Sequence, residues 1–263
     1  MIPLEAKQLS MFEDNVHLVP DNVQNNIVPF PSRPNPSTPI KQQTTSPLKD
    51  KDLIEAVKEQ LLYSSKKHGY RNYMIFLFAI HTALRMNDVL TIRLQDIWDE
   101  QTLSIKPSCP ILESKTHKIA DLDFSQELRK ELKEYILTIP NRTPYTPLFP
   151  SQKTQSKVIP KNNKGIPTPP TKDDTGCLSR KSMWKVLHTV GITLNIDHLA
   201  CHTCRKTAAY HIYQSYKGQL IENQFSALDI VQQILNHSSS NVTLRYIGVT
   251  PDITHSVYRN LNL

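Results

Sequence analysis

Residues 202–216 read HTCRKTAAYHIYQSY, a stretch whose residue types predict an amphipathic helix. His202 and Arg205 are three residues apart, so both side chains project from one face of that helix. The segment 227–237, ALDIVQQILNH, predicts another helix. No strand–helix alternation of the kind that builds a parallel sheet accompanies these segments, so this half of the chain is expected to be helical.

Working back along the chain, residues 51–100 contain apolar residues at helical spacing, most clearly in the run Tyr73–Ile80. Within this block, residues 81–97 read HTALRMNDVLTIRLQDI. We expect a turn near Leu84–Arg85, because the strongly apolar pattern stops there. A second amphipathic pattern, which includes Asp88, restarts a helix directly after the turn.

Short segments with alternating polarity come next. TLSIKP (102–107) and KIADLDF (118–124) predict short strands, and ILESKTH (111–117) lies between them as a further strand or a turn. Residues 125–138 predict a helix with Ser125 as its N-cap, and SRKSMWKVLHTVG (179–191) predicts a helix that ends at its glycine. The predicted class is therefore mainly α with a small antiparallel β-sheet, an α+β fold.

Proline marks the domain limits. Of 19 prolines, eight lie in residues 1–50 and eight in residues 140–170. The first segment is also rich in Ser, Thr, Asn and Gln, so it cannot bury enough apolar surface to offset its ordering entropy. We predict a disordered Pro-rich tail over 1–50, dispensable for activity, and one domain over 51–263. A long Pro/Lys-rich loop at about 140–175 interrupts that domain.

Charge and composition favour a polyanion as partner. The chain carries a net charge of +7, and because residues 1–50 hold four basic and five acidic groups, the remainder is at +8. No run approaches the roughly 18 apolar residues of a membrane span. The opening residues lack the apolar core of a secretory signal, and the four cysteines are expected to be reduced thiols. These features predict a cytoplasmic protein that does not bind membranes.

Residues 235–248 read LNHSSSNVTLRYIG, in which His237 precedes Tyr246 by nine residues. Together with Arg85 and the H-x-x-R pair of the helix above, this run resembles the tyrosine recombinase (phage integrase) family. It is most similar to the small integrases of bacterial plasmids and phages, over the whole of residues 51–263. The resemblance implies an integrase-type DNA breaking–rejoining catalytic domain that acts in a prokaryotic cell or on its mobile elements.

The resemblance also implies a mechanism. Tyr246 would attack the phosphodiester and form a covalent 3′-phosphotyrosine, which conserves the bond energy and needs no cofactor and no metal. Attack adds negative charge to the non-bridging oxygens, and the forked guanidiniums of Arg85 and Arg205 would neutralise it. The function implied is that of a site-specific DNA recombinase or integrase.

Four further residues take supporting roles by the same resemblance. Lys115, in the segment ESKTHK, is the candidate general acid for the leaving 5′ oxygen, with Lys106 and Lys118 as close neighbours. His202 would move the tyrosine proton or bind the phosphate, and His237 would position the phosphate. Asp88, three residues after Arg85, matches an accessory acidic position.

The partners implied are double-stranded DNA and three further copies of the chain, since the family exchanges strands as a tetramer. Two alternatives stay open: a type IB topoisomerase, which uses the same residue types to relax supercoils, and a DNA-binding regulator that keeps the fold without cutting. The filled set of candidate catalytic positions argues against the regulator. Where typical members carry an N-terminal helical domain, this chain has the Pro-rich tail.

Overall fold

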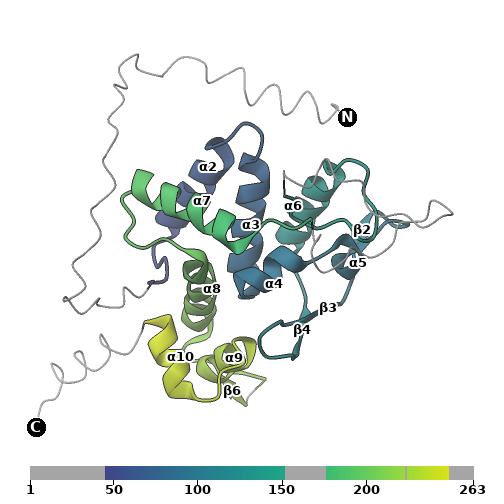
Figure 1. Ribbon diagram of the computed structural model, residues 1–263. Helices are drawn as coiled ribbons and strands as arrows, with labels where there is room; N and C mark the ends of the chain where they lie inside the picture. The colour runs from purple at the N-terminus through teal and green to yellow at the C-terminus, as the bar shows by residue number, and fades with distance from the viewer. Residues whose placement is uncertain (1–44, 152–175, 223, 249–263) are drawn as a thin grey trace, which may run out of the picture. The chain divides into compact units, whose positions relative to one another are not determined.

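The computed structural model describes residues 45–151, 176–222 and 224–248, and helices dominate these ranges (Figure 1). The predicted class is confirmed, because every sheet in the described part is small and antiparallel. The helices are α2 (Lys51–Tyr63), α3 (Gly69–Thr82), α4 (Met86–Thr91), α5 (Leu94–Ile97), α6 (Gln126–Leu137), α7 (Arg180–Thr193), α8 (Cys201–Tyr216), α9 (Ala227–Ile234) and α10 (Ser240–Ile247).

The strands form three separate two-stranded hairpins rather than the single small sheet expected. In the first half, β3 and β4 pair from Cys109 with Leu122 to Leu112 with Ile119, and residues 113–118 form the turn between them. The third hairpin, between α8 and α9, was not predicted, because strands of two residues leave no readable alternation. The strands are β1 (Trp98–Asp99), β2 (Ser104–Ile105), β3 (Cys109–Leu112), β4 (Ile119–Leu122), β5 (Leu220–Ile221) and β6 (Phe225–Ser226).

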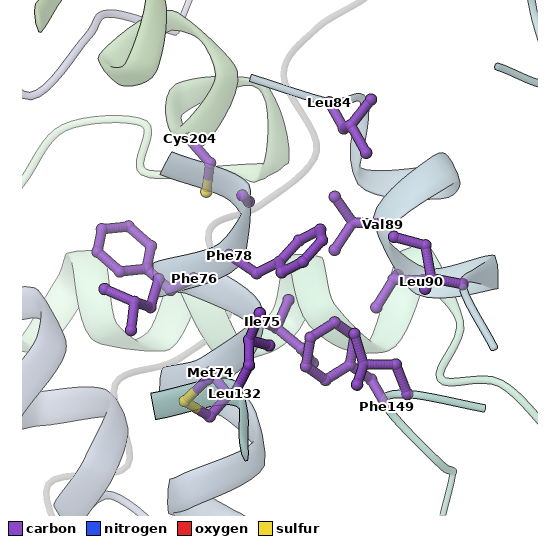
Figure 2. Close-up of a cluster of buried hydrophobic side chains, with 14 of the residues drawn as sticks. Met74, Ile75, Phe76, Phe78, Leu84, Val89, Leu90, Leu132, Phe149 and Cys204 are labelled. Atoms are coloured by element: carbon purple, nitrogen blue, oxygen red, sulfur yellow. The ribbon is translucent and has the colours of Figure 1, made fainter. Parts of the chain in front are cut away.

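The core is built around α3, whose apolar side chains are shielded from solvent almost all the way round. Helices α2, α6 and α8 contact α3, and Figure 2 shows its side chains gathered with those of Val89, Leu132 and Phe149. The ring centroids of Phe78 and Phe149 are 6.1 Å apart in an edge-on arrangement. Burial of each such ring contributes about 1.5–3 kcal/mol, and it fixes the end of α3, from which the chain turns to Arg85.

Two helix ends test the predicted boundaries. Ser125 is the N-cap of α6, as predicted, and its Oγ accepts a hydrogen bond of 3.2 Å from the Leu128 amide. The predicted end of α7 at Gly191 is wrong, because the helix continues to Thr193. A Cβ at Gly191 would lie 2.9 Å from Leu199 Cβ, so glycine is present there for close packing rather than for termination.

Helix α10 carries Tyr246 but was not predicted as a helix. Its eight residues begin with Ser240 and Asn241, and they provide little more than two turns of pattern. It ends at Gly248, whose φ of +70° is accessible to glycine without strain. Helices α8, α9 and α10 contact one another and form the lower group in Figure 1.

A short strap, residues 45–50, precedes α2 and belongs to the packed body. Leu48 is 4% exposed, and its amide donates a 2.9 Å hydrogen bond to Thr207 Oγ1 on α8. Lys206 Nζ donates to the carbonyl oxygen of Thr45 at 2.5 Å. The rest of the predicted 1–50 tail lies outside the described residues.

The predicted loop at about 140–175 divides in the same way. Residues 152–175 lie outside the described residues, whereas Leu148 and Phe149 are fully buried, and the Leu148 amide donates to the Ile92 carbonyl at 2.9 Å. Proline content alone therefore overstated how early the loop begins. Within the described ranges, no helix has the length and apolarity that crossing a membrane would require.

We predict that a chain starting at Lys51 is less stable than one starting at Thr45. The shorter chain lacks Leu48 and also Asp50, whose side chain caps α2 by accepting from the Asp52 amide. Together these losses should lower the free energy of unfolding by about 2–4 kcal/mol, measured by urea denaturation. Equal urea midpoints for the two chains would show that the strap does not stabilise the body.

Candidate active site

The structure brings most of the predicted site residues together from segments far apart in the sequence. Arg85 is the N-cap of α4, Arg205 lies in the second turn of α8, and Tyr246 lies near the end of α10. His237 follows α9, and Lys115 lies in the β3–β4 turn. The site is thus assembled where four helices and one hairpin meet.

Arg205 is the buried centre of this arrangement. Only 3% of the residue is exposed, and it donates through Nη1 to the Ala83 carbonyl at 2.6 Å and through Nη2 to the Leu235 carbonyl at 2.9 Å. Ala83 follows α3 in the left-handed region, with φ +53°, which turns its carbonyl toward the guanidinium. One side chain therefore joins α8 to the ends of α3 and α9.

Glu113 is a site residue that the sequence reasoning did not identify. Its Oε1 lies 2.9 Å from Arg85 Nη1 and 3.6 Å from Arg205 Nη1, and its side chain is 1% exposed. Burial by itself would raise the pKa of Glu113, but the Thr116 hydroxyl and the two guanidiniums outweigh this effect and hold the pKa below its usual range. The carboxylate is therefore ionised between two cations.

A signal for Glu113 was present in the sequence. Cys109 and Ile111 point inward along β3, and Glu113 continues that period of two. An acidic residue at an inward-facing position needs a cationic or donor partner, since an unpaired buried carboxylate is very costly. The inward-facing alternation of β3, continued to residue 113, therefore predicts an ion pair at Glu113.

Asp88 takes a structural position beside the site. It is 1% exposed, and its Oδ1 accepts from the Ser114 amide at 2.9 Å and from Ser114 Oγ at 2.6 Å. The carboxylate thereby fastens α4 to the β3–β4 turn. This contact gives the predicted accessory residue a physical task, namely to hold the turn that carries Lys115.

Tyr246 lies against His237 and beside Arg205. The Tyr246 and His237 rings meet edge to face with centroids 5.1 Å apart, and Lys206 Nζ lies 5.3 Å from the Tyr246 ring centre. Burial raises the pKa of the Tyr246 hydroxyl, and the charges of Arg205 and Arg85 oppose that rise. The phenol is therefore protonated at neutral pH, and it would have to lose its proton in order to act as a nucleophile.

The two histidines are suited to accept or relay that proton. His237 Nδ1 is 3.1 Å from Thr243 Oγ1, and burial together with Arg205 and Arg85 lowers the pKa of His237. His202 is exposed at the start of α8, and its pKa is lowered by partial burial and by the cations around it, Arg180 first. Both imidazoles are consequently neutral at pH 7.

Lys115 is a predicted residue for which the structure shows no contact with the others. It is exposed in the turn and makes no hydrogen bond or ion pair within the described part of the chain. Lys118, at the other end of the turn, lines an open pocket of about 330 Å³ together with His237. The remaining lining residues are Asp229, Gln232, Gln233 and Asn236.

Residues 49–252 match the phage integrase family. The chain belongs to this family. Membership confirms the predicted recognition and fold, and it makes the chain a tyrosine recombinase, an enzyme that breaks and rejoins DNA strands.

Individual relatives agree with this membership. The probable integrase/recombinase YoeC of Bacillus subtilis is 29% identical over 213 residues, which cover 81% of this chain and 94% of YoeC. Tyrosine recombinase XerA of Pyrococcus furiosus is 22% identical over 81% of this chain and 62% of its own length.

Solved structures show the same fold at low identity. The post-cleavage complex of the XerH recombinase with palindromic difH substrate has a TM-score of 0.52 at 18% identity, covering 82% of this chain and 53% of XerH. The XerA recombinase structure has a TM-score of 0.51 at 19% identity, covering 84% and 68%. The chain thus spans about half the length of the XerH protein.

We predict that Arg205→Lys destabilises the free protein, because a single ammonium cannot reach both the Ala83 and Leu235 carbonyls while approaching Glu113. Loss of these buried contacts should lower the free energy of unfolding by about 2–4 kcal/mol, measured by urea denaturation without DNA. Arg245→Lys, an exposed position on α10, is the control and should change stability by less than about 0.5 kcal/mol. If both substitutions had equal effects, the bridging role of Arg205 would be disproved.

Proposed function

We propose that this chain is a site-specific recombinase that cleaves DNA through a covalent 3′-phosphotyrosine on Tyr246. The convergence of two arginines on one point beside the Tyr246 hydroxyl supports the proposal most directly, since Arg205 lies against Tyr246 and shares the anion Glu113 with Arg85. A site that holds one carboxylate oxygen between two guanidiniums can hold a phosphate oxygen in the same way.

In the proposed reaction, the Tyr246 oxygen forms a bond to phosphorus while the bond from phosphorus to the 5′ oxygen breaks. Arg85 and Arg205 stabilise the negative charge that builds on the non-bridging oxygens. Because the phenol is protonated at rest, its proton passes to a neutral imidazole, for which His202 and His237 are the candidates. The reverse attack by a 5′ hydroxyl rejoins the strand without metal or nucleotide.

The leaving 5′ oxygen needs a proton, which we assign to Lys115. Its exposed position in the β3–β4 turn leaves the ammonium free to meet DNA. The two residues that precede it are held in place, Ser114 by Asp88 and Glu113 by Arg85. Lys118 lies nearer to His237 and is the competing candidate. A lysine in this turn would approach the leaving 5′ oxygen only when the DNA is bound.

Double-stranded DNA is the proposed substrate, consistent with the basic body of the chain. The similar XerH recombinase was solved on its difH substrate, and the Tn1549 integrase was solved with a circular intermediate DNA. We extend the proposal to a cytoplasmic enzyme that assembles as a homotetramer on DNA for strand exchange. Relaxation of any supercoiled plasmid without a defined site would instead indicate the topoisomerase alternative.

The Tyr246→Phe substitution should abolish the covalent DNA adduct while leaving folding and DNA binding intact. Phenylalanine keeps the ring that packs against His237 and loses only the nucleophilic oxygen. The test is trapping on a nicked suicide substrate taken from the flanks of the gene, with the attachment site mapped by mass spectrometry. An adduct that persists on another tyrosine, Tyr213 for example, would remove Tyr246 from the mechanism.

Replacing the scissile 5′ oxygen by sulfur should rescue Lys115→Ala. A thiolate leaves without a proton, so the variant should cleave normal DNA more slowly, by about 10²–10⁴-fold, and recover most of its rate on the sulfur-substituted strand. Arg85→Ala should not be rescued, since its contact is with the non-bridging oxygens. Lys118→Ala is the matched control from the same turn, and rescue of that variant instead would transfer the role to Lys118.

A further inference from the structure

Glu113 makes four contacts with its carboxylate although no step of the proposed reaction uses it. Oε1 faces Arg85 at 2.9 Å and Arg205 at 3.6 Å, while Oε2 accepts from Thr116 Oγ1 at 2.5 Å and from Asn236 Nδ2 at 2.9 Å. These partners come from α4, α8, the β3–β4 turn and the segment after α9. The carboxylate therefore joins the start of α4, α8 and the segment after α9 to the β3–β4 turn.

Glu113 Oε1 lies between Arg85 and Arg205, the place where the proposed mechanism puts a non-bridging oxygen of the scissile phosphate. A carboxylate oxygen at ion-pair distance from two guanidiniums carries negative charge where a non-bridging phosphate oxygen could be held. The formal charges of Arg85, Arg205, Glu113 and Asp88 cancel, so the cluster as it stands offers an anion no net attraction. A phosphate brought beside a buried carboxylate would be repelled, because water screens buried charges poorly.

Backbone hydrogen bonds tie Glu113 to the turn that it begins. Its amide donates to the Lys118 carbonyl at 2.9 Å, and the His117 amide donates to the Glu113 carbonyl at 2.9 Å. In the sequence, Lys115 lies inside the segment 113–118 that these two hydrogen bonds close. Withdrawal of the Glu113 side chain from the arginines therefore disturbs the turn that carries the candidate general acid.

We infer that Glu113 is a placeholder for the scissile phosphate: it occupies the anion site between Arg85 and Arg205 in the free chain, and the phosphate displaces it. The inference rests on the proposed function and makes Glu113 a positioning residue. Displacement exchanges Glu113 for the phosphate at both guanidiniums and moves the turn with Lys115, so the site becomes active only when DNA supplies the replacing charge.

The test uses Glu113→Gln in the full chain, with inorganic phosphate as the probe and isothermal calorimetry at constant ionic strength. The amide keeps the size of the side chain but removes the competing charge. Phosphate should bind at least about fivefold tighter than to the wild type, the factor that a unit charge about 4 Å away exerts even in bulk water. The variant should also unfold at a lower urea concentration without phosphate, and phosphate should restore more stability to it than to the wild type.

Asp88→Asn is the matched control, because it removes one negative charge from an equally buried carboxylate whose Oδ1 accepts from Ser114 rather than from an arginine. It should lose stability without a comparable gain in phosphate affinity. Equal gains in the two variants would show that net charge, and not occupancy of the anion site, controls binding. Unchanged or weaker phosphate binding by Glu113→Gln would overturn the inference.

Hydrogen exchange on the wild-type chain tests the same inference without any substitution. Saturating phosphate should accelerate exchange at the Glu113 and His117 amides, while amides of α2 stay unchanged as an internal control. Slower or unchanged exchange in the turn would contradict displacement of Glu113. None of these measurements needs DNA cleavage, so the absence of a Tyr246 adduct would count against the proposed function alone.

Discussion

The double hydrogen bond from Arg205 to the carbonyls of Ala83 and Leu235 is the contact on which the site depends. Helices α3 and α9 end at those carbonyls, and helix ends leave such groups without intrahelical partners. A guanidinium can satisfy two of them at once because its donors are fixed in a fork. Arg205, which we propose to bind the scissile phosphate, is thus also the residue that joins α8 to the ends of α3 and α9. Any substitution of it should therefore affect stability as well as activity.

The β3–β4 hairpin depends on the same cluster from the opposite side. Asp88 holds Ser114, Glu113 holds the arginines and Asn236, and Lys115 follows directly in an exposed position. Two buried acidic groups therefore orient a basic residue that they do not touch. The arrangement holds the arginines in place and leaves the lysine side chain exposed.

Periodicity in the sequence was sufficient for α3, α6 and α8, because each presents at least three turns of apolar or capped pattern. The order of Arg85, His202, Arg205, His237 and Tyr246 indicated the family, since few families carry those residue types together in this order. Shorter elements were missed for a physical reason: α10, β1 and the β5–β6 hairpin are held by tertiary contacts rather than by local preference. Glu113 was missed because its role depends on partners from three other segments.

The backbone of Ala83 has a consequence for which sequences this site can tolerate. Its φ of +53° disfavours most side chains, its methyl group is 1% exposed, and its carbonyl is fixed by Arg205. Random mutagenesis should therefore find almost no functional replacements at this position other than glycine, although the residue is buried in the free protein. Substitutions at Ala83 would then be tolerated as poorly as substitutions at a catalytic residue, and the cause would be the main-chain geometry alone.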